Sequence, residues 1–219
     1  MSATLTLALD AALSVGTVAL LRDGVLVAEA AVAMRGEREE RLMPAVRDVF
    51  RSAGATTADL TEVVCGAGPG SFTSLRIAAA IAKGIAAVRG CPLAAVGSLP
   101  LVAAGAARPL APGRYLAAIE AMRGECFAAE LAVDEEGVVR QEGGARIVAR
   151  VDLEREAARA GARTLGPGLD VEAVPHARGA LRVEGRRVVA LDSWEPDYGR
   201  LAEAQVRWES AHGRPLPVR

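Results

Sequence analysis

The sequence predicts an α/β protein of two lobes, each built from a mixed β-sheet with flanking helices. Short aliphatic strands alternate with segments of helical period, and the same order of three strands joined by turns begins twice along the chain. Hydrophobic residues make up 51% of the 219 residues, which excludes a disordered chain and supplies apolar surface for two cores. We place the first lobe at residues 1–105 and a second, smaller lobe with a C-terminal helix at 106–219.

The first lobe is expected to open with three strands, at residues 4–9, 15–21 and 25–32. Asp23 and Gly24 form a two-residue turn that brings the third strand back antiparallel to the second. The three strands therefore make a meander.

A helical period then replaces the strand pattern. Apolar side chains recur at helical spacing over residues 42–53, and Gly54 ends the segment. Pro44 lies inside this helix, so the helix either starts near Met43 or is kinked there. The sequence next predicts a strand at 63–65, a glycine-rich loop at 66–70, a helix at 71–88, a strand at 92–96 and a small helix capped by Ser98.

The stretch 105–113 is rich in Gly, Pro and Arg and marks the lobe boundary, after which the opening pattern recurs. Asp10 and Glu120 then hold equivalent places, each at the tip of the first strand of its unit. Either an internal duplication or the chance likeness of two unrelated meanders accounts for the recurrence. The second lobe is expected to contain strands at 115–119, 126–133 and 138–139, a helix at 152–160, a turn at 166–168, a strand near 187–191 and a final helix at 201–211.

Charge and composition exclude several classes of function. The formal net charge is −1, so no overall positive field draws the chain onto a phosphate backbone. Residues 1–9 have no cationic leader and Asp10 interrupts their apolar run, so we expect no signal peptide, no membrane span and a cytoplasmic location. Three cysteines without CxxC spacing are interpreted as reduced, buried thiols, and two isolated histidines lead us to expect no metal.

The glycine-rich loop is the best candidate for a ligand site. Gly68, Gly70, Ser71 and Thr73 lie between a strand and a helix, where backbone N–H groups and the helix dipole can receive an anion. The loop lacks the lysine of a Walker A motif and the spacing of a dinucleotide fingerprint. The alternative is structural: the glycines permit a tight turn, and Ser71 or Thr73 caps the helix.

Asp10 and Glu120 are candidates for a second kind of site. They are placed as the two acids of an actin- or Hsp70-like ATPase are, one per lobe, facing a metal-bound nucleotide. Phosphate cradles of that kind use hydroxyl groups after the first acid, whereas this chain offers Ala11, Ala12 and Leu13. No Ser-His-Asp, Cys-His or HExxH arrangement occurs in the sequence, so we expect no catalysis, no cofactor and at most weak nucleotide binding.

The helix at 71–88 gives the strongest signal for a protein partner. Both of its broad faces are apolar when residues are placed at 100° steps. We expect the face with Ile77, Ile81 and Ile85 to pack on the sheet. The opposite face is smooth and rich in alanine, so either the helix at 42–53 or a second chain covers it. The predicted partner-binding residues belong to this alanine face and the polar edge beside it: Leu75, Arg76, Ala79, Ala82, Lys83 and Ala86.

A long motif from Gly68 to Ile77, GPGSFTSLRI, followed by AKG at 82–84, carries a resemblance to a known family. It closely resembles the GPGSFTGLRIG…AKG signature of the TsaB (YeaZ) family of bacterial tRNA-modification proteins. The resemblance is dense over residues 4–100 and sparse but collinear beyond. Shorter segments that resemble the family are Leu7-Ala-Leu-Asp10, Val18-Ala-Leu20, Arg41-Leu-Met-Pro44, Val96-Gly-Ser-Leu99, Arg123-Gly-Glu125 and Pro196-Asp-Tyr-Gly-Arg200.

This resemblance implies an actin/Hsp70-like (ASKHA) fold with two related lobes. It also implies a role in a complex: TsaB-type proteins join a TsaD-like catalytic subunit and a TsaE-like ATPase to place threonylcarbamoyl on adenosine 37 of tRNAs that read codons beginning with A. The TsaB-type subunit is the non-catalytic scaffold, and tRNA reaches it through the complex. Helices of the first lobe pair with the TsaD-like subunit, or with a second copy when the chain is alone.

The chain departs from the family pattern at several positions. The family commonly has Asp-Thr-Ser where this chain has Asp10-Ala11-Ala12, Gly where Ser74 stands and His where Arg38 aligns. Near the second acid, the family has Asp-Ala-Arg where this chain has Glu120-Ala121-Met122-Arg123. Each departure weakens the case for nucleotide or metal binding. The HxxxH of TsaD-like relatives is also absent from the sequence, so the catalytic subunit fits poorly.

Two alternatives to the scaffold remain from the sequence. A small ATP-dependent kinase or ATPase of the same fold would use Asp10, Glu120 and the glycine loop. An inactive protease-like homologue would bind an unrelated partner.

Overall fold

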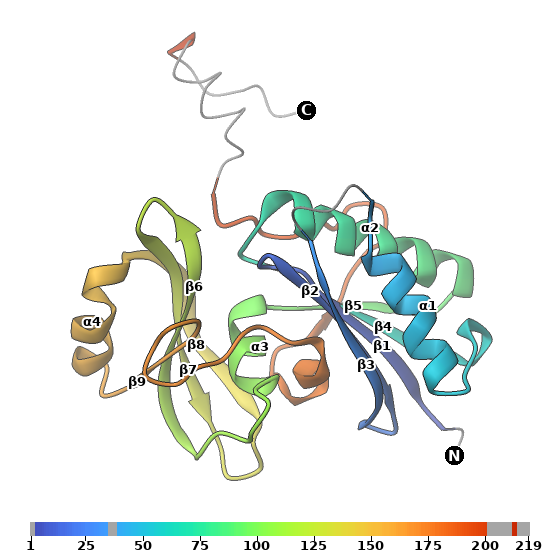
Figure 1. Cartoon of the computed structure of the whole chain (residues 1–219), viewed down its shortest axis with the longest axis horizontal. Coiled ribbons are helices and arrows are strands. Elements are labelled where there is room, and N and C mark those ends of the chain that lie inside the picture. Colours follow the sequence, from blue (N-terminus) through green and yellow to red (C-terminus); the bar gives the residue numbers. More distant parts are fainter. Residues whose placement is uncertain (1–2, 35–38, 201–211, 214–219) are drawn as a thin grey trace.

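The computed structural model describes residues 3–34, 39–200 and 212–213 and confirms an α/β protein of two lobes (Figure 1). The first lobe holds a six-stranded sheet with the order β10-β5-β4-β1-β2-β3, and the second a four-stranded sheet with the order β8-β7-β6-β9. The final helix predicted at 201–211 lies outside the described residues.

The predicted opening meander is confirmed as β1 (Leu5–Asp10), β2 (Val15–Arg22) and β3 (Val25–Ala33), all antiparallel to their neighbours. Asp23 and Gly24 both have positive φ angles, of 50° and 80°, as the predicted two-residue turn requires. All six residues of β1 are buried, because this strand lies inside the sheet and is covered on both faces.

Two helices cover one face of the first sheet. α1 (Leu42–Ser52) and α2 (Phe72–Arg89) pack into the same apolar cluster as the inward-facing leucines of β1 (Figure 1). Pro44 causes no kink, since it lies in the first turn of α1, where backbone N–H groups have no partner within the helix. β4 (Glu62–Gly66) and β5 (Leu93–Val96) run parallel to β1 beneath α2. A short 3-10 helix, η1 (Thr57–Asp59), precedes β4.

The two lobes share one core around the short helix α3 (Ser98–Ala104). Leu99, Leu101 and Val102 of α3 pack with apolar residues of both sheets, and the 3-10 helix η3 (Ala177–Arg182) joins the same cluster. Figure 1 shows α3 between the two sheets. Ser98 was expected to cap this helix, but Gly97 holds the cap position and Ser98 is the first helical residue.

The second lobe repeats the first four-stranded unit. β6 (Gly113–Met122), β7 (Glu125–Val133) and β8 (Val139–Ala149) form an antiparallel meander, which η2 (Arg150–Asp152) and α4 (Leu153–Arg159) connect to β9 (Arg163–Leu165). β9 is parallel to β6, just as β4 is parallel to β1. The orders β4-β1-β2-β3 and β9-β6-β7-β8 are therefore equivalent, which favours an internal duplication.

After the second sheet the chain returns to the first. β10 (Arg187–Val188), shorter than the strand predicted near 187–191, pairs with β5 at the edge of the first sheet. Trp194 is buried in the cluster beneath α1 and α2. The range 106–219 therefore contains a segment that completes the first lobe, and a single boundary near residue 105 does not separate the lobes in space.

The structure reverses the predicted orientation of α2. The residues of its alanine face are no more than 5% exposed and pack into the protein core: Leu75, Ala79, Ala82 and Ala86. Their assignment as partner-binding residues is wrong. Small side chains lie toward the sheet because they let the long helix approach the strands closely.

The isoleucine face is also placed differently from the expectation. Ile77, Ile81 and Ile85 are half-buried beside the sheet cluster and do not form its centre. On the polar edge, Arg76 is exposed and Lys83 is half-buried. In the part of the chain that the structure describes, no helix is long and apolar enough to cross a membrane.

Candidate functional site

Asp10 lies at the carboxyl end of β1, where it is 1% exposed. Its Oδ1 accepts a hydrogen bond from the Ala12 N–H at 3.1 Å, and its Oδ2 accepts one from the Ser98 hydroxyl at 2.6 Å. The Ser98 oxygen in turn accepts the N–H of Gly68 at 3.1 Å. Burial raises the pKa of Asp10, and the hydrogen bonds from Ser98 and Ala12 oppose that shift. The carboxyl group thus joins β1, α3 and the glycine loop within the fold.

The glycines of the loop permit close packing. A Cβ atom at Gly66 would lie 2.0 Å from the Asp10 Oδ2, and one at Gly70 would lie 2.3 Å from the Ala12 carbonyl oxygen. At Gly68, which has a φ angle of 86°, the Cβ would lie 1.9 Å from the Asp197 carbonyl oxygen. Only glycine fits at these three places, so the structural alternative for the loop is well supported.

The hydroxyl groups at the start of α2 do not cap it as expected. Ser71 occupies the cap position, but its Oγ lies 3.1 Å from the Oγ of Ser74 and accepts no backbone N–H. The Ser71 N–H donates to the Ala12 carbonyl at 2.7 Å, and Thr73 is exposed on the first turn. The Ser71 hydroxyl and N–H groups therefore contact other groups of the protein and are not free to bind a ligand.

Glu120 does not join Asp10 in one site. It lies on β6 opposite Cys126, and its side chain is exposed, whereas Asp10 is enclosed. No hydrogen bond or ion pair within the described residues joins the two acids. The kinase alternative requires both acids to face a shared nucleotide, and this arrangement does not favour it.

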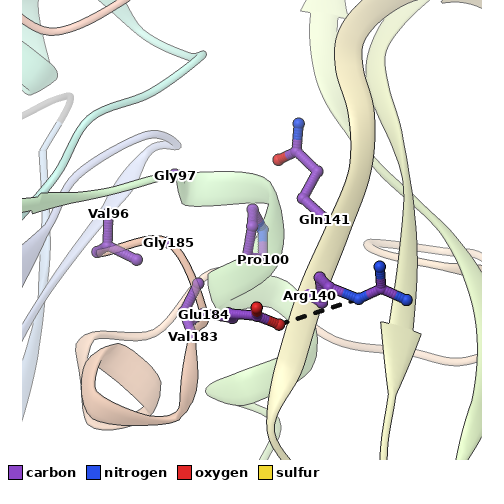
Figure 2. Close-up of a pocket in the computed structure, with 8 residues that line it drawn as sticks. All are labelled: Val96, Gly97, Pro100, Arg140, Gln141, Val183, Glu184 and Gly185. Atoms are coloured by element: carbon purple, nitrogen blue, oxygen red, sulfur yellow. Dashed lines mark ion pairs between the residues drawn. The ribbon is translucent and has the colours of Figure 1, made fainter. Parts of the chain in front are cut away.

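A pocket of about 400 Å³ opens between the lobes (Figure 2). The side chains of Pro100 and Gln141 lie on either side of it, and the Arg140 Nε is 3.9 Å from a Glu184 carboxylate oxygen. None of the residues predicted for a ligand site lines this pocket. Its lining residues are Val96, Gly97, Pro100, Arg140, Gln141, Val183, Glu184 and Gly185.

The outer face of α2 carries a regular row of mostly small residues. Their spacing alternates between four and three positions, which keeps them on one side of a helix, and all are exposed or half-exposed: Thr73, Ile77, Ala80, Gly84 and Ala87. We call this set the α2 outer row. A Cβ atom added at Gly84 would meet no atom within 4 Å, so the middle of the row is open. The sequence contains the same spacing, but an apolar pattern alone does not tell this side of the helix from the alanine face.

Comparisons with known proteins agree with the motifs. A family model described as TsaD, tRNA N6-adenosine threonylcarbamoyltransferase, matches residues 33–169. The tRNA threonylcarbamoyladenosine biosynthesis protein TsaB of Escherichia coli (strain K12) is 39% identical over 132 residues, which are 60% of this chain and 57% of that protein. TsaB of Bacillus subtilis (strain 168) is 35% identical over 69 residues, which are 32% of this chain and 30% of that protein. The chain thus matches less than two thirds of the length of these curated relatives.

Two solved structures from Pseudomonas aeruginosa resemble this chain over most of its length. One, an uncharacterized protein with similarity to peptidase YeaZ, has a TM-score of 0.75 and 28% identity over 90% of this chain and 100% of that chain. The other, YeaZ, has a TM-score of 0.72 and 25% identity over 89% of this chain and 99% of that chain.

The chain belongs to the TsaB/YeaZ family. The resemblance inferred from the Gly68 to Ile77 motif is therefore confirmed, as is the actin/Hsp70-like (ASKHA) fold class that it implied. In this family member the motif forms the close-packed loop and the first turns of α2, with the α2 outer row extending from it.

Proposed function

We propose that the chain is a non-catalytic scaffold subunit in tRNA threonylcarbamoyladenosine biosynthesis, and that it docks a TsaD-like catalytic subunit through the α2 outer row. A TsaE-like ATPase joins the same assembly in the cytoplasm, and tRNA is reached through the complex. The names of the relatives support the pathway. The open row of small residues along an 18-residue helix supports the docking role.

The α2 outer row suits close helix packing. Thr73, Ala80 and Gly84 lack long side chains, so a helix of a partner can lie near the α2 backbone over several turns. The half-exposed Ile77 adds apolar surface that a partner removes from water. Arg76 is exposed beside the row and offers a charge that selects a partner with a complementary acid.

We propose that the same row also pairs two copies of the chain when the TsaD-like subunit is absent. A row on one helix is self-complementary about a two-fold axis, so a second copy can cover it until the TsaD-like subunit competes for it. The two assemblies are then mutually exclusive because they use the same surface.

The buried state of Asp10 supports a role without catalysis. Its carboxyl group is 1% exposed and is held by Ser98 and Ala12, so it is engaged within the fold and is not presented to a substrate. We accordingly propose that chemistry takes place on the TsaD-like subunit and that this chain needs no cofactor.

Association with the TsaD-like subunit of the same organism tests the proposal. Ala80→Arg and Gly84→Arg each place a long, charged side chain in the α2 outer row, and we expect binding to weaken roughly 30-fold or more. Ala158→Arg is the matched control, because Ala158 is exposed on α4 in the second lobe. Affinity is measured by calorimetry and assembly by gel filtration, with circular dichroism to check folding. If both row variants bind as tightly as the control, the docking surface lies elsewhere.

A further inference from the structure

The segment after β10 crosses from one lobe to the other. We call residues 189–200 the strap. It begins beside β5, where the Val189 N–H donates to the Leu93 carbonyl at 2.9 Å, and it ends against β7 of the second lobe. In Figure 1 its orange-red trace runs along α2 toward the second lobe. The proposed docking role does not account for this path, which ends with Tyr198 packed against the core that the two lobes share.

The first part of the strap is firmly anchored in the first lobe. The indole of Trp194 is buried there, with the Lys83 ammonium 5.8 Å from its ring centroid. The Asp197 N–H then donates to the Ala67 carbonyl at 2.7 Å, so the strap is hydrogen-bonded to the glycine loop. Tyr198 follows with its ring centroid 4.5 Å from that of Phe72, the first residue of α2.

The last part of the strap binds the second lobe through few groups. Arg200 forms an ion pair with Glu125 at the start of β7, and its guanidinium carbon lies 5.8 Å from the ring centroid of Phe127. Gly199 fits where the strap, the loop and the second lobe meet: its Cβ would lie 2.5 Å from the Phe127 ring and 2.7 Å from Pro69. The strap thus contacts side chains of both lobes that lie far apart in the sequence.

We propose that the strap is an interlobe fastener that fixes the relative orientation of the two lobes and holds the glycine loop and first turn of α2 in place. Phe127 belongs to the core around α3 and Tyr198 packs against it, so the strap covers one edge of the shared core and ties that edge to the glycine loop and to β7. The strong anchor at Trp194 and the weaker one at Arg200 make the second-lobe end the one that releases. A consequence that rests on the proposed function is that release also disturbs Thr73, at the start of the α2 outer row.

The first test measures local opening in the isolated chain, so that it does not depend on any partner. Arg200→Gln removes the ion pair with Glu125. We expect amide hydrogen exchange in peptides covering 66–75 and 194–200 to quicken at least about fivefold. Arg163→Gln is the control, since it breaks an exposed ion pair with Asp170, of 2.9 Å, in the second lobe. Unchanged exchange over 66–75 in the Arg200 variant overturns the proposal.

The second test measures the orientation of the lobes. Spin labels at Ser52→Cys on α1 and Ala158→Cys on α4, in a Cys91→Ser background, report the distance between helices that lie at opposite ends of the molecule (Figure 1). Adding Arg200→Gln is expected to broaden the distance distribution, and the charge-swapped pair Glu125→Arg with Arg200→Glu is expected to narrow it again. A distribution that Arg200→Gln leaves unchanged contradicts the fastener.

A pair of glycine variants separates packing from backbone strain. Gly199 and Gly161 have similar positive φ angles, of 68° and 60°, but only at Gly199 would a Cβ meet other atoms within 4 Å. Gly199→Ala should quicken exchange over 66–75 and broaden the interlobe distance more than Gly161→Ala does. Equal behaviour of the two variants overturns the proposal, and Arg200→Gln remains the decisive variant if Gly199→Ala fails to fold.

Discussion

The two lobes contain the same four-stranded unit but complete it differently. In the first lobe, α1 of 11 residues and α2 of 18 residues cover one face of the sheet. In the second lobe, α4 of seven residues covers part of the corresponding face, and charged side chains of β6, β7 and β8 cover the rest. There Arg114 pairs with Glu130 and Glu142, at 3.1 Å in each case, and Arg146 pairs with Glu130 and Glu156.

This difference bears on the proposed docking surface. A long helix on a sheet leaves a second side exposed to solvent, and in α2 that side carries the α2 outer row of mostly small residues, with Arg76 beside it. A face covered by ion pairs offers a partner little apolar area and would have to be desolvated at a cost. The two sheets have the same strand order, and within the described residues the first alone carries a long helix with an open row of mostly small residues.

The largest expected effect comes from charging the inner side of α2. Ala82→Arg places a guanidinium in the first-lobe core, where the alanine is 0% exposed, and should lower the free energy of unfolding by at least about 3 kcal/mol. Ala80→Arg, two residues away on the α2 outer row, should change it by no more than about 0.5 kcal/mol. Urea denaturation of both variants measures the contrast, and equal losses would mean that α2 is packed on both sides.

The equivalent acids of the two lobes should differ next most. Asp10→Ala removes the acceptor of the Ser98 hydroxyl and the Ala12 N–H and should cost about 2–4 kcal/mol of stability. Asp10→Asn keeps one acceptor oxygen and avoids a buried charge, so it should cost less. Glu120→Ala, at an exposed position, should stay within about 0.5 kcal/mol. A large loss at Glu120 in thermal unfolding would show that the second acid also has a structural role.

A pH effect is expected at the junction of the lobes, where His176 caps the start of η3. Its Nδ1 accepts the Arg178 N–H at 3.1 Å, and burial, helped by the Arg178 charge, lowers the pKa of His176 to about 4. The unfolded chain, whose histidine has its ordinary pKa near 6.5, binds more protons between these values. Stability is therefore complete above about pH 6.5 and should fall by about 1–2 kcal/mol as the pH drops toward 4.5.

His176→Asn isolates this contribution. Asparagine can accept the same backbone N–H but does not titrate, so the variant should lose the part of the pH dependence that His176 supplies. Asp10, whose pKa is raised, acts with the opposite sign and is the same in both proteins. Denaturation curves between pH 4.5 and 7.5 that run parallel for the two proteins would contradict the assignment.

The smallest effect is expected on the charged face of the second lobe. Arg114 is about half exposed and bridges two glutamates, so Arg114→Gln should cost about 0.5–1 kcal/mol in low salt and less at 1 M salt. Arg51→Gln on α1 breaks a single exposed pair with Asp48 and should cost less still. If salt leaves the difference between the two variants unchanged, the face is not held by its ion pairs.

The elements with a clear period could be predicted from the sequence. The two meanders have aliphatic strands with turn residues between them, and α1 and α2 have long apolar repeats, so their positions were correct within a few residues. β9 has three residues and β10 has two, which is too short for any period, and β8 was underestimated because Gly143 and Gly144 interrupt it.

The candidate site could be predicted only in part. The sequence shows that α2 has two apolar sides. Periodicity cannot decide which of them lies on the sheet. The small alanines were predicted to face a partner, whereas they face the sheet. The sequence places Asp10 at the end of its strand. Its partner Ser98 lies on a different element and comes close to Asp10 only when the lobe is folded. The strap has no repeating pattern, and its role depends on contacts between distant segments.

The late position of the strap has a consequence for biosynthesis. Trp194 fills part of the first-lobe core, and β10 extends the first sheet, yet both follow the entire second sheet in the sequence. When only residues 1–105 have emerged from the ribosome, the first lobe therefore still lacks the indole of Trp194 and the edge strand β10. The nascent lobe must wait for nearly all the remaining chain to emerge before it can close, and during that interval it exposes apolar surface that chaperones recognise.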